Sequence, residues 1–186
     1  MKYIIGITGA SGSVYGLRLI EVLKKQGHEV GLVITDSGRK VLEYECGLTA
    51  GELGRQADAL YDINDTAAPI ASGSYKTAAM IIVPCSMKTA ACIANGISDN
   101  LLTRAADVMM KEGRPLILVP RETPLNAVHL ENLLKLSRLG VKIVPAMPGF
   151  YHRPETVEDI VNMLVGKICD SLGIDTELFP RWTGLK

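Results

Sequence analysis

Short apolar runs alternate with segments of helical spacing along all 186 residues, and this alternation constrains the fold more than any other feature. The runs are rich in Ile and Val, as strands of a parallel sheet covered on both faces are. The predicted strands lie at Ile4–Ile7, Val30–Thr35, Leu60–Ile63, Ala79–Pro84, Pro115–Val119 and Val141–Val144. We therefore predict one three-layer α/β/α domain over residues 1–186, with a doubly wound parallel sheet of flavodoxin or Rossmann type.

The helices between these runs are expected to begin at capping residues and to end near Gly or Pro. They are predicted from Val14 onward, from Asp36 or Ser37 to Cys46, over Thr49–Ala57, after Thr89, from a Ser98-Asp99 cap to Gly113, over Asn126–Leu139 and over Pro154–Leu172. The segments Asn64–Ser74 and Met147–Arg153 are predicted loops.

Composition excludes several classes of function. Acidic and basic residues balance at twenty each, whereas a nucleic-acid-binding domain normally carries a basic excess. No apolar stretch is long enough to span a bilayer and no secretory leader is recognisable, so we expect a cytoplasmic protein without membrane contact. The four cysteines form no C-x-x-C pair and have no His at ligand spacing, which predicts free thiols and no metal site.

The first predicted strand leads into a Gly/Ser-rich loop and then directly into a helix. Gly9 and Gly12 permit a sharp turn and a close approach to a ligand, and Ser11 adds a hydroxyl donor. Backbone N–H groups at a helix N-terminus favour a phosphate. The spacing matches neither G-x-G-x-x-G nor a P-loop, so a plain βα turn is the alternative.

Parallel strands end at the same edge of a sheet, so the residues that follow them are expected to face one crevice. These residues are Ser11, Ser37, Ser86 to Thr89, Arg121-Glu122 and Phe150-Tyr151. The set is rich in hydrogen-bond donors, as a phosphate-bearing aromatic ligand requires. Arg121 is suited to clamp a phosphate or a ring oxygen and Glu122 to move protons, the alternative being a surface Arg–Glu pair.

Four further residues have two interpretations each. Arg104 and Lys111 share a helix face, where a solvated charge stripe is the simpler explanation. Lys167 falls at the edge of an apolar helix stripe, either as a snorkelling side chain or as an ammonium directed into a pocket. Tyr151 is either a core aromatic residue or a phenol that reaches a phosphate.

Five segments, distributed over nearly the whole chain, have a specific order and spacing: TGASGSVYGLRL, ASGS, PCSMKTAACIANGISDNLLTRAADVMMKEGRPLILVPRETP, HLENLLKLSRLGVKIVPAMPGFYHRP and PRW. Together they resemble the UbiX-type flavin prenyltransferase family, within the wider group of flavin-binding cysteine decarboxylase-like folds. The resemblance implies transfer of a dimethylallyl group from dimethylallyl phosphate to N5 and C6 of reduced FMN, without a metal. It also implies a homododecamer with active sites between subunits, and a product, prenylated FMN, that serves UbiD-type decarboxylases.

The resemblance assigns roles residue by residue. The implied flavin-binding residues are Gly9, Ala10, Ser11, Ser37, Ser86, Met87, Lys88, Thr89 and Arg121. The implied prenyl-phosphate residues are Tyr151, Lys167, Lys111 and Arg104. The implied catalytic residues are Glu122, Ser11 and Glu45. Some members carry Arg where this chain has Lys167. The lysine keeps the positive charge but cannot make the bidentate contact with a phosphate that an arginine makes.

The implied reaction begins when the cationic residues neutralise the departing phosphate. The flavin N5 then captures C1′ of the prenyl group, C6 closes a ring at C3′, and either Glu122 or the phosphate takes the released proton. Two alternatives stay open, an FMN-dependent decarboxylase of peptidyl or pantothenoyl cysteine and a non-catalytic FMN carrier. The P-x-M-N-x-x-M-W-type segment of the cysteine decarboxylases is replaced here by residues 145–149, PAMPG.

Overall fold

A single parallel sheet forms the centre of the structure, a computed structural model that describes residues 1–184. Its six strands have the order β3-β2-β1-β4-β5-β6. They are β1 (Lys2–Ile7), β2 (Glu29–Ile34), β3 (Ala59–Tyr61), β4 (Ala79–Cys85), β5 (Leu116–Pro120) and β6 (Lys142–Ile143). The predicted doubly wound parallel sheet is confirmed, and the strand order is the Rossmann one rather than that of flavodoxin.

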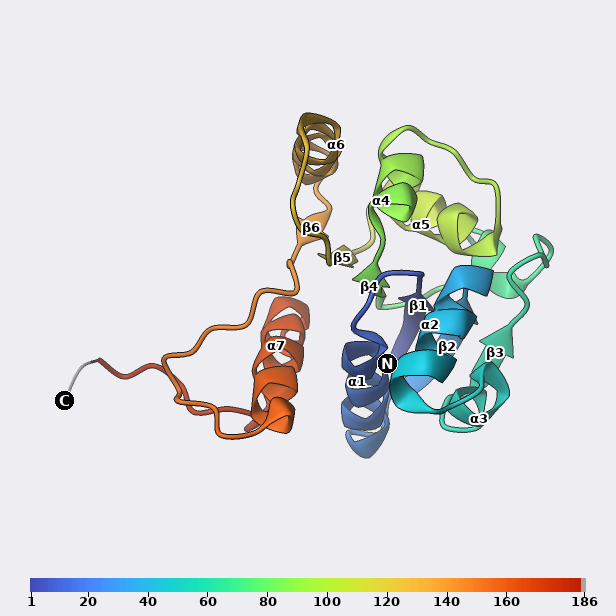
Figure 1. Ribbon diagram of the computed structural model, residues 1–186. Coiled ribbons are helices and arrows are strands. Elements are labelled where there is room, and N and C mark those ends of the chain that lie inside the picture. The colour runs from blue at the N-terminus through green and yellow to red at the C-terminus, as the bar shows by residue number, and fades with distance from the viewer. Residues whose placement is uncertain (185–186) are drawn as a thin grey trace.

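Helices cover both faces of this sheet (Figure 1). One face carries α1 (Ser13–Lys25), α2 (Asp36–Cys46), α3 (Ala50–Gly54) and α7 (Val157–Leu172). The other carries α4 (Met87–Ala94), α5 (Leu101–Lys111), α6 (Ala127–Arg138) and the short 3-10 helix η1 (Pro69–Ala71). Strand residues alternate between the two layers: Tyr3 and Ile5 of β1 belong to the core under α1 and α7, and Ile4 to the core under α4 and α5.

Two predicted helix starts are wrong by a few residues, because polar side chains cap the helices further along the chain. The helix α5 begins after Asn100 and not after Ser98-Asp99, since the Asn100 side chain accepts a hydrogen bond from the Thr103 N–H at 3.0 Å. The helix α7 begins after Thr156 rather than at Pro154, and Thr156 forms a capping box there.

The shortest predicted elements differ most from the structure. The helix predicted over Thr49–Ala57 is the five-residue α3, and the strand predicted over Leu60–Ile63 lies at Ala59–Tyr61 as β3. The last strand shrinks to the two residues of β6. Segments this short carry little periodicity, so a capping box at Thr49 sets the start of α3, and pairing with neighbouring strands sets the bounds of β3 and β6. In residues 1–184, no helix combines the length and apolar character needed to cross a bilayer.

Candidate functional site

The strand order reverses between β1 and β4, which is where open α/β sheets bind ligands. Thr8, just past β1, is fully buried at this point and joins the two loops that follow the strands. Its hydroxyl donates to the Pro84 carbonyl at 2.8 Å and accepts from the Ser86 N–H at 2.7 Å. Sequence reasoning did not single out Thr8, because both contacts come from residues more than seventy positions away.

A crevice of about 510 Å³ opens beside this point. Its walls are Gly9, Thr35, Asp36, Ser37, Ile63, Asn64, Ser86, Lys88, Thr89 and Asn100. Thr35, Ser86 and Asn100 are the N-caps of α2, α4 and α5, so three helices begin at the crevice. Helix N-termini carry partial positive charge and directed N–H groups, and the crevice is therefore suited to a phosphate.

Five of the predicted flavin-binding residues line the crevice: Gly9, Ser37, Ser86, Lys88 and Thr89. Lys88 lies at its edge, where its ammonium pairs with Asp99 at 2.8 Å. Ala10 and Met87 are buried and are not among its walls. The prediction that every post-strand segment faces one crevice is only partly correct. Ser11, Arg121 and Glu122 are not among its walls, and Phe150 and Tyr151 follow the edge strand β6, far from the switch point.

Gly9 allows two walls of the crevice to meet closely. A Cβ at this position would lie 2.6 Å from the Cβ of Ser37, a separation that real structures do not tolerate. A glycine is therefore required where the first loop passes the start of α2.

The N-terminus of α1 holds an anion that the protein supplies itself. One carboxylate oxygen of Glu45 accepts hydrogen bonds from the N–H groups of Gly12 at 2.8 Å and Ser13 at 3.0 Å. These donors are therefore not open to a phosphate, contrary to the expectation from the first loop. The anion-binding helix ends open to a ligand are instead those of α2, α4 and α5.

Two predicted catalytic residues, Ser11 and Glu45, lie together beside the crevice. Burial works against ionisation of Glu45, but hydrogen bonds from the Ser11 hydroxyl and from the Gly12 and Ser13 N–H groups outweigh it. The pKa of the Glu45 carboxyl is therefore below its ordinary value, and the group is an anion at neutral pH. Arg121 completes the cluster, since its Nε donates to the Ser11 carbonyl at 3.2 Å.

Glu122 lies on the exposed loop that follows β5. Its Oε1 accepts a hydrogen bond from the Thr123 N–H at 3.0 Å, and the rest of the carboxylate faces solvent. The arrangement leaves Glu122 accessible to a ligand that binds over Arg121.

The predicted prenyl-phosphate residues of α5 lie on a different surface. Arg104 pairs with Asp107 at 3.0 Å and donates to the Ala71 carbonyl at 3.3 Å, and Lys111 pairs with Glu112 at 3.2 Å. Lys111 is at the C-terminal end of α5, roughly 16 Å along the helix from its N-cap at 1.5 Å per residue. Neither Arg104 nor Lys111 is among the walls of the crevice.

The loop of residues 71–75, which includes the ASGS segment, lies against this end of α5. The Ser72 and Ser74 hydroxyls are 2.9 Å apart, and Arg114 donates to the Tyr75 carbonyl at 2.8 Å and to the Gly73 carbonyl. Arg104, Lys111, Arg114, Ser72 and Ser74 thus form one cationic, hydroxyl-rich surface, which we call the α5 half-site. The serines were visible in the sequence, but the role of Arg114 depends on long-range contacts.

Tyr151 and Lys167 lie on the opposite side of the sheet, on the side that α7 covers. The Lys167 ammonium is 3.6 Å from Asp170, and the Tyr151 ring lies 5.7 Å from the Trp182 ring in an edge arrangement. We call Tyr151 and Lys167 the α7 half-site. Within residues 1–184, no three His, Cys, Asp or Glu side chains are grouped so that they could hold a metal ion.

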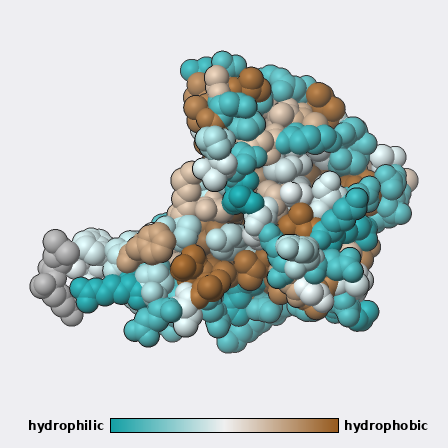
Figure 2. Space-filling model, viewed as in Figure 1, coloured by the Kyte–Doolittle hydropathy of each residue, from teal (hydrophilic) through white to brown (hydrophobic). Residues whose placement is uncertain are grey.

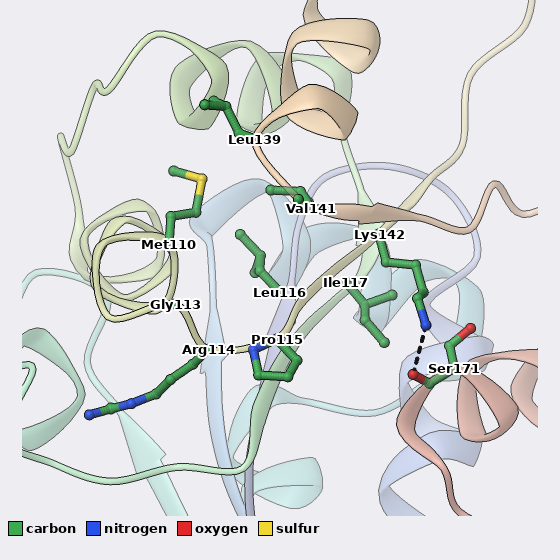
Figure 3. A pocket seen from close by; sticks show the side chains of 11 residues that line it. Met110, Gly113, Arg114, Pro115, Leu116, Ile117, Leu139, Val141, Lys142 and Ser171 are labelled. Atoms are coloured by element: carbon green, nitrogen blue, oxygen red, sulfur yellow. Dashed lines mark hydrogen bonds between the residues drawn. The ribbon is translucent and has the colours of Figure 1, made fainter.

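A second cavity, of about 460 Å³, lies at the opposite edge of the sheet, where β5 and β6 begin (Figure 3). Leu116, Leu139 and Val141 form apolar walls, and the Lys142 ammonium bonds the Ser171 carbonyl at 3.0 Å. None of the predicted site residues lines this cavity, and the candidate site is the crevice at the switch point.

A Rossmann-type sheet with a phosphate-binding crevice at its switch point is typical of flavin- and nucleotide-binding proteins. A family model described as Flavoprotein matches residues 1–169, which favours a flavin-binding protein over other nucleotide-binding proteins. The chain is a flavoprotein by this match.

Full-length relatives specify the kind of flavoprotein. The chain is 52% identical to the flavin prenyltransferase UbiX of Methanothermobacter thermautotrophicus, over 97% of this chain and 95% of the relative. It is 46% identical to the UbiX of Thauera aromatica, over 99% and 95%. The chain belongs to the UbiX flavin prenyltransferase family.

Solved structures agree with this assignment. A dodecameric FMN-dependent UbiX-like decarboxylase from Escherichia coli O157:H7 superimposes with a TM-score of 0.97 at 46% identity, covering 99% of this chain and all of the other. AnUbiX (PadA1), in complex with FMN and dimethylallyl pyrophosphate, has a TM-score of 0.97 at 40% identity, covering 100% and 98%. The peptidyl-cysteine decarboxylase EpiD, at 24% identity and a TM-score of 0.62, shares the fold alone.

Proposed function

We propose that this protein transfers a dimethylallyl group from a dimethylallyl phosphate to reduced FMN, without a metal ion. One observation carries the proposal: a structure that superimposes over the whole chain with a TM-score of 0.97 holds FMN together with dimethylallyl pyrophosphate. The crevice at the switch point fits the first of these ligands, because three helix N-termini and several hydroxyl groups converge on it.

The FMN phosphate is assigned to the crevice between Ser37, Ser86 and Thr89. The flavin ring then extends toward Ser11 and Arg121, which are joined by a hydrogen bond of 3.2 Å. Reduced flavin supplies the nucleophilic N5 and C6 atoms. The protein orients the two reactants and excludes water from them.

The prenyl phosphate requires cations that one chain does not bring together. The α5 and α7 half-sites lie over opposite faces of the sheet. We assign the phosphate to a junction where the α5 half-site of one copy meets the α7 half-site of another, in a homo-oligomer that is a dodecamer by analogy with the E. coli relative. Lys111, Arg104, Lys167 and Tyr151 there neutralise the phosphate as the allylic C–O bond breaks.

The two glutamates have different proposed roles. Glu45 stays ionised because of its hydrogen bonds, which suits it to stabilise developing positive charge and not to donate a proton. Glu122 is exposed beside Arg121, and either it or the departing phosphate accepts the proton released at ring closure. Delivery of the product to a UbiD-type decarboxylase and a cytoplasmic location stay predictions.

Mass spectrometry tests the proposal directly. Purified protein is mixed with reduced FMN and dimethylallyl phosphate in the presence of a chelator, and the flavin is then extracted. A gain of one prenyl unit on the flavin is expected, and its absence contradicts the proposal. Glu122→Gln is expected to slow ring closure, and unchanged turnover would remove Glu122 from the proton step.

Cysteine decarboxylation is the competing function. The peptidyl-cysteine decarboxylase EpiD and the cypemycin decarboxylase CypD are only 24% and 16% identical to this chain, so their structural similarity shows the fold alone. Adding a peptidyl cysteine to the protein with oxidised FMN separates the two functions. Bleaching of the flavin absorbance would favour decarboxylation, whereas the proposed prenyl transfer predicts no change.

A further inference from the structure

The chain after α7 folds back on that helix and is fastened to it by one carboxylate. Asp170 of α7 receives two hydrogen bonds from the Arg181 guanidinium, the longer of them 2.8 Å. Arg181 also donates to the Thr176 carbonyl at 3.2 Å and lies 4.6 Å from the centre of the Phe179 ring. Residues 173–182, which we call the C-terminal arm, are therefore held by a bidentate pair of the strong kind.

The helix provides a slot for the arm. Phe179 is only 7% exposed, and a Cβ at Gly166 would lie 2.4 Å from its ring. A glycine in the middle of a helix normally costs roughly 1 kcal/mol of helix stability relative to alanine. Here it is required, because the aromatic ring occupies the space that any side chain at 166 would take.

A row of aromatic rings connects Phe179 with the α7 half-site. The His152 ring lies 6.4 Å from Phe179 and 5.7 Å from Tyr151, and the Tyr151 ring lies 5.7 Å from Trp182. Both ring nitrogens of His152 are buried and lack a hydrogen-bond partner among the described residues, so these contacts are made by ring packing. The position of Tyr151 therefore depends on that of the arm.

Asp170 also contacts the other member of the half-site. Its carboxylate is 3.6 Å from the Lys167 ammonium, one helical turn earlier on α7. Hydrogen bonds from Arg181 lower the pKa of Asp170, so the carboxyl is ionised at neutral pH. The Asp170 carboxylate thus faces two cations, Arg181 and Lys167. Lys167 is the more distant of the two and remains able to contact a phosphate.

We propose that Asp170 is a positioning residue for the prenyl phosphate: through Arg181 it fixes the C-terminal arm, so that Trp182 packs on Tyr151, and through its own carboxylate it orients Lys167. The placement of the arm stands on the contacts above, whereas the identity of the ligand rests on the proposed function. The phosphate then meets a phenol and an ammonium that are already oriented, which reduces the entropy lost on binding.

Trp182 reports on the arm without any assay of activity, because it is the only tryptophan of the chain. In Asp170→Asn and in Arg181→Gln we expect a red-shifted Trp182 emission and stronger quenching by acrylamide. Asp170→Glu restores part of the shift, and Asp175→Asn, a matched change on the arm, leaves the spectrum as in the unchanged protein. An unshifted spectrum in both Asp170→Asn and Arg181→Gln overturns the proposal.

Kinetics tests the second half of the inference. Asp170→Asn is expected to raise the KM for dimethylallyl phosphate roughly tenfold, the equivalent of one oriented charge contact, while FMN affinity is retained. A spectral shift without a change in KM overturns the positioning role. If the unchanged protein prenylates no flavin, the proposed function fails, and titration with inorganic phosphate then tests the positioning role separately. Weaker phosphate binding in Asp170→Asn than in the unchanged protein supports that role, and equal binding overturns it.

Discussion

Gly9 is the residue at which the absence of a side chain matters most for the crevice. The backbone of the first loop passes the start of α2 so closely that a Cβ would meet Ser37 at 2.6 Å. The identities of Gly9 and Ser37 in the sequence do not predict this close approach, since the two residues follow two different strands. This close approach sets the distance between two walls of the proposed FMN phosphate site.

Gly9→Ala is therefore expected to displace Ser37 and to weaken FMN binding about tenfold, which corresponds to about 1.4 kcal/mol. Titration of FMN with the protein, followed by flavin fluorescence, measures the change. Gly51→Ala on α3 is the matched control, because a Cβ there has open space around it. Equal FMN affinity in the two variants would show that the Ser37 wall does not contact the ligand.

Glu45 gives a pH-dependent prediction. Its folded-state pKa lies below the ordinary value of 4.5, so its contribution to stability is present above that pH and is lost as the pH falls through the lowered pKa. The side chain is exposed, which keeps the effect small. Because Glu45 caps α1, Glu45→Gln is expected to lower the free energy of unfolding by about 1 kcal/mol at neutral pH.

Urea unfolding at neutral pH and at about pH 3.5 measures both parts of this expectation. The difference between the two proteins should shrink at the lower pH, where the native carboxylate is partly protonated. A constant difference across this range would mean that the charge of Glu45 does not contribute to the cap.

The helix α6 buries few of its residues. Leu136 is its one buried residue, and polar contacts from Asn132 and Lys135 to Asn95 tie it to α4. Val128, Leu130 and Leu134 stay more than half exposed, and apolar groups gather over α6 in Figure 2. An outer face of this kind is typical of helices that contact another subunit.

Leu136→Ala is expected to cost 2 to 5 kcal/mol of folding free energy, roughly the range for a buried leucine. Leu134→Glu is expected to keep the helical circular dichroism signal but to lower the mass of the oligomer. Urea unfolding and light scattering measure the two effects. Full assembly of Leu134→Glu would exclude the outer face of α6 from the subunit contacts.

At this scale the sequence predicts much but not all. Apolar periodicity located the main strands and helices, because burial on both faces leaves a pattern along the chain. It did not locate the Asn100 cap, which depends on a single hydrogen bond, and it shifted the bounds of the short β3, which depend on pairing with β2. The residues after β2 and β4 were predicted to line the site for a topological reason, whereas Thr8, Arg114 and Asp170 act through contacts that no local pattern records.

On the scale of the whole molecule, the proposed phosphate site belongs to no single chain. Lys111 and Lys167 lie on helices that cover opposite faces of the sheet. If the site takes one lysine from each of two copies, two inactive variants that each lack a different lysine should complement each other in a mixed oligomer.

Lys111→Ala and Lys167→Ala are each expected to be nearly inactive. When the two are unfolded together, refolded and assembled as mixed oligomers, about a quarter of the junctions receive both lysines, and activity returns in proportion. Prenyl transfer is measured before and after mixing. No recovery, with mixed assembly verified by mass, would place both lysines in the site of one chain or outside it.

The two half-sites lie over opposite faces of the sheet, and this predicts how activity depends on the concentration of the protein. On the proposed assignment, separated copies in dilute solution are expected to retain the flavin crevice but to lack a complete site for the leaving phosphate. Specific activity should then rise with the concentration of the chain and reach a plateau once assembly is complete, while flavin capture stays constant throughout. If the phosphate site is shared in this way, the protein is expected to bind flavin at any concentration and to prenylate it only after assembly.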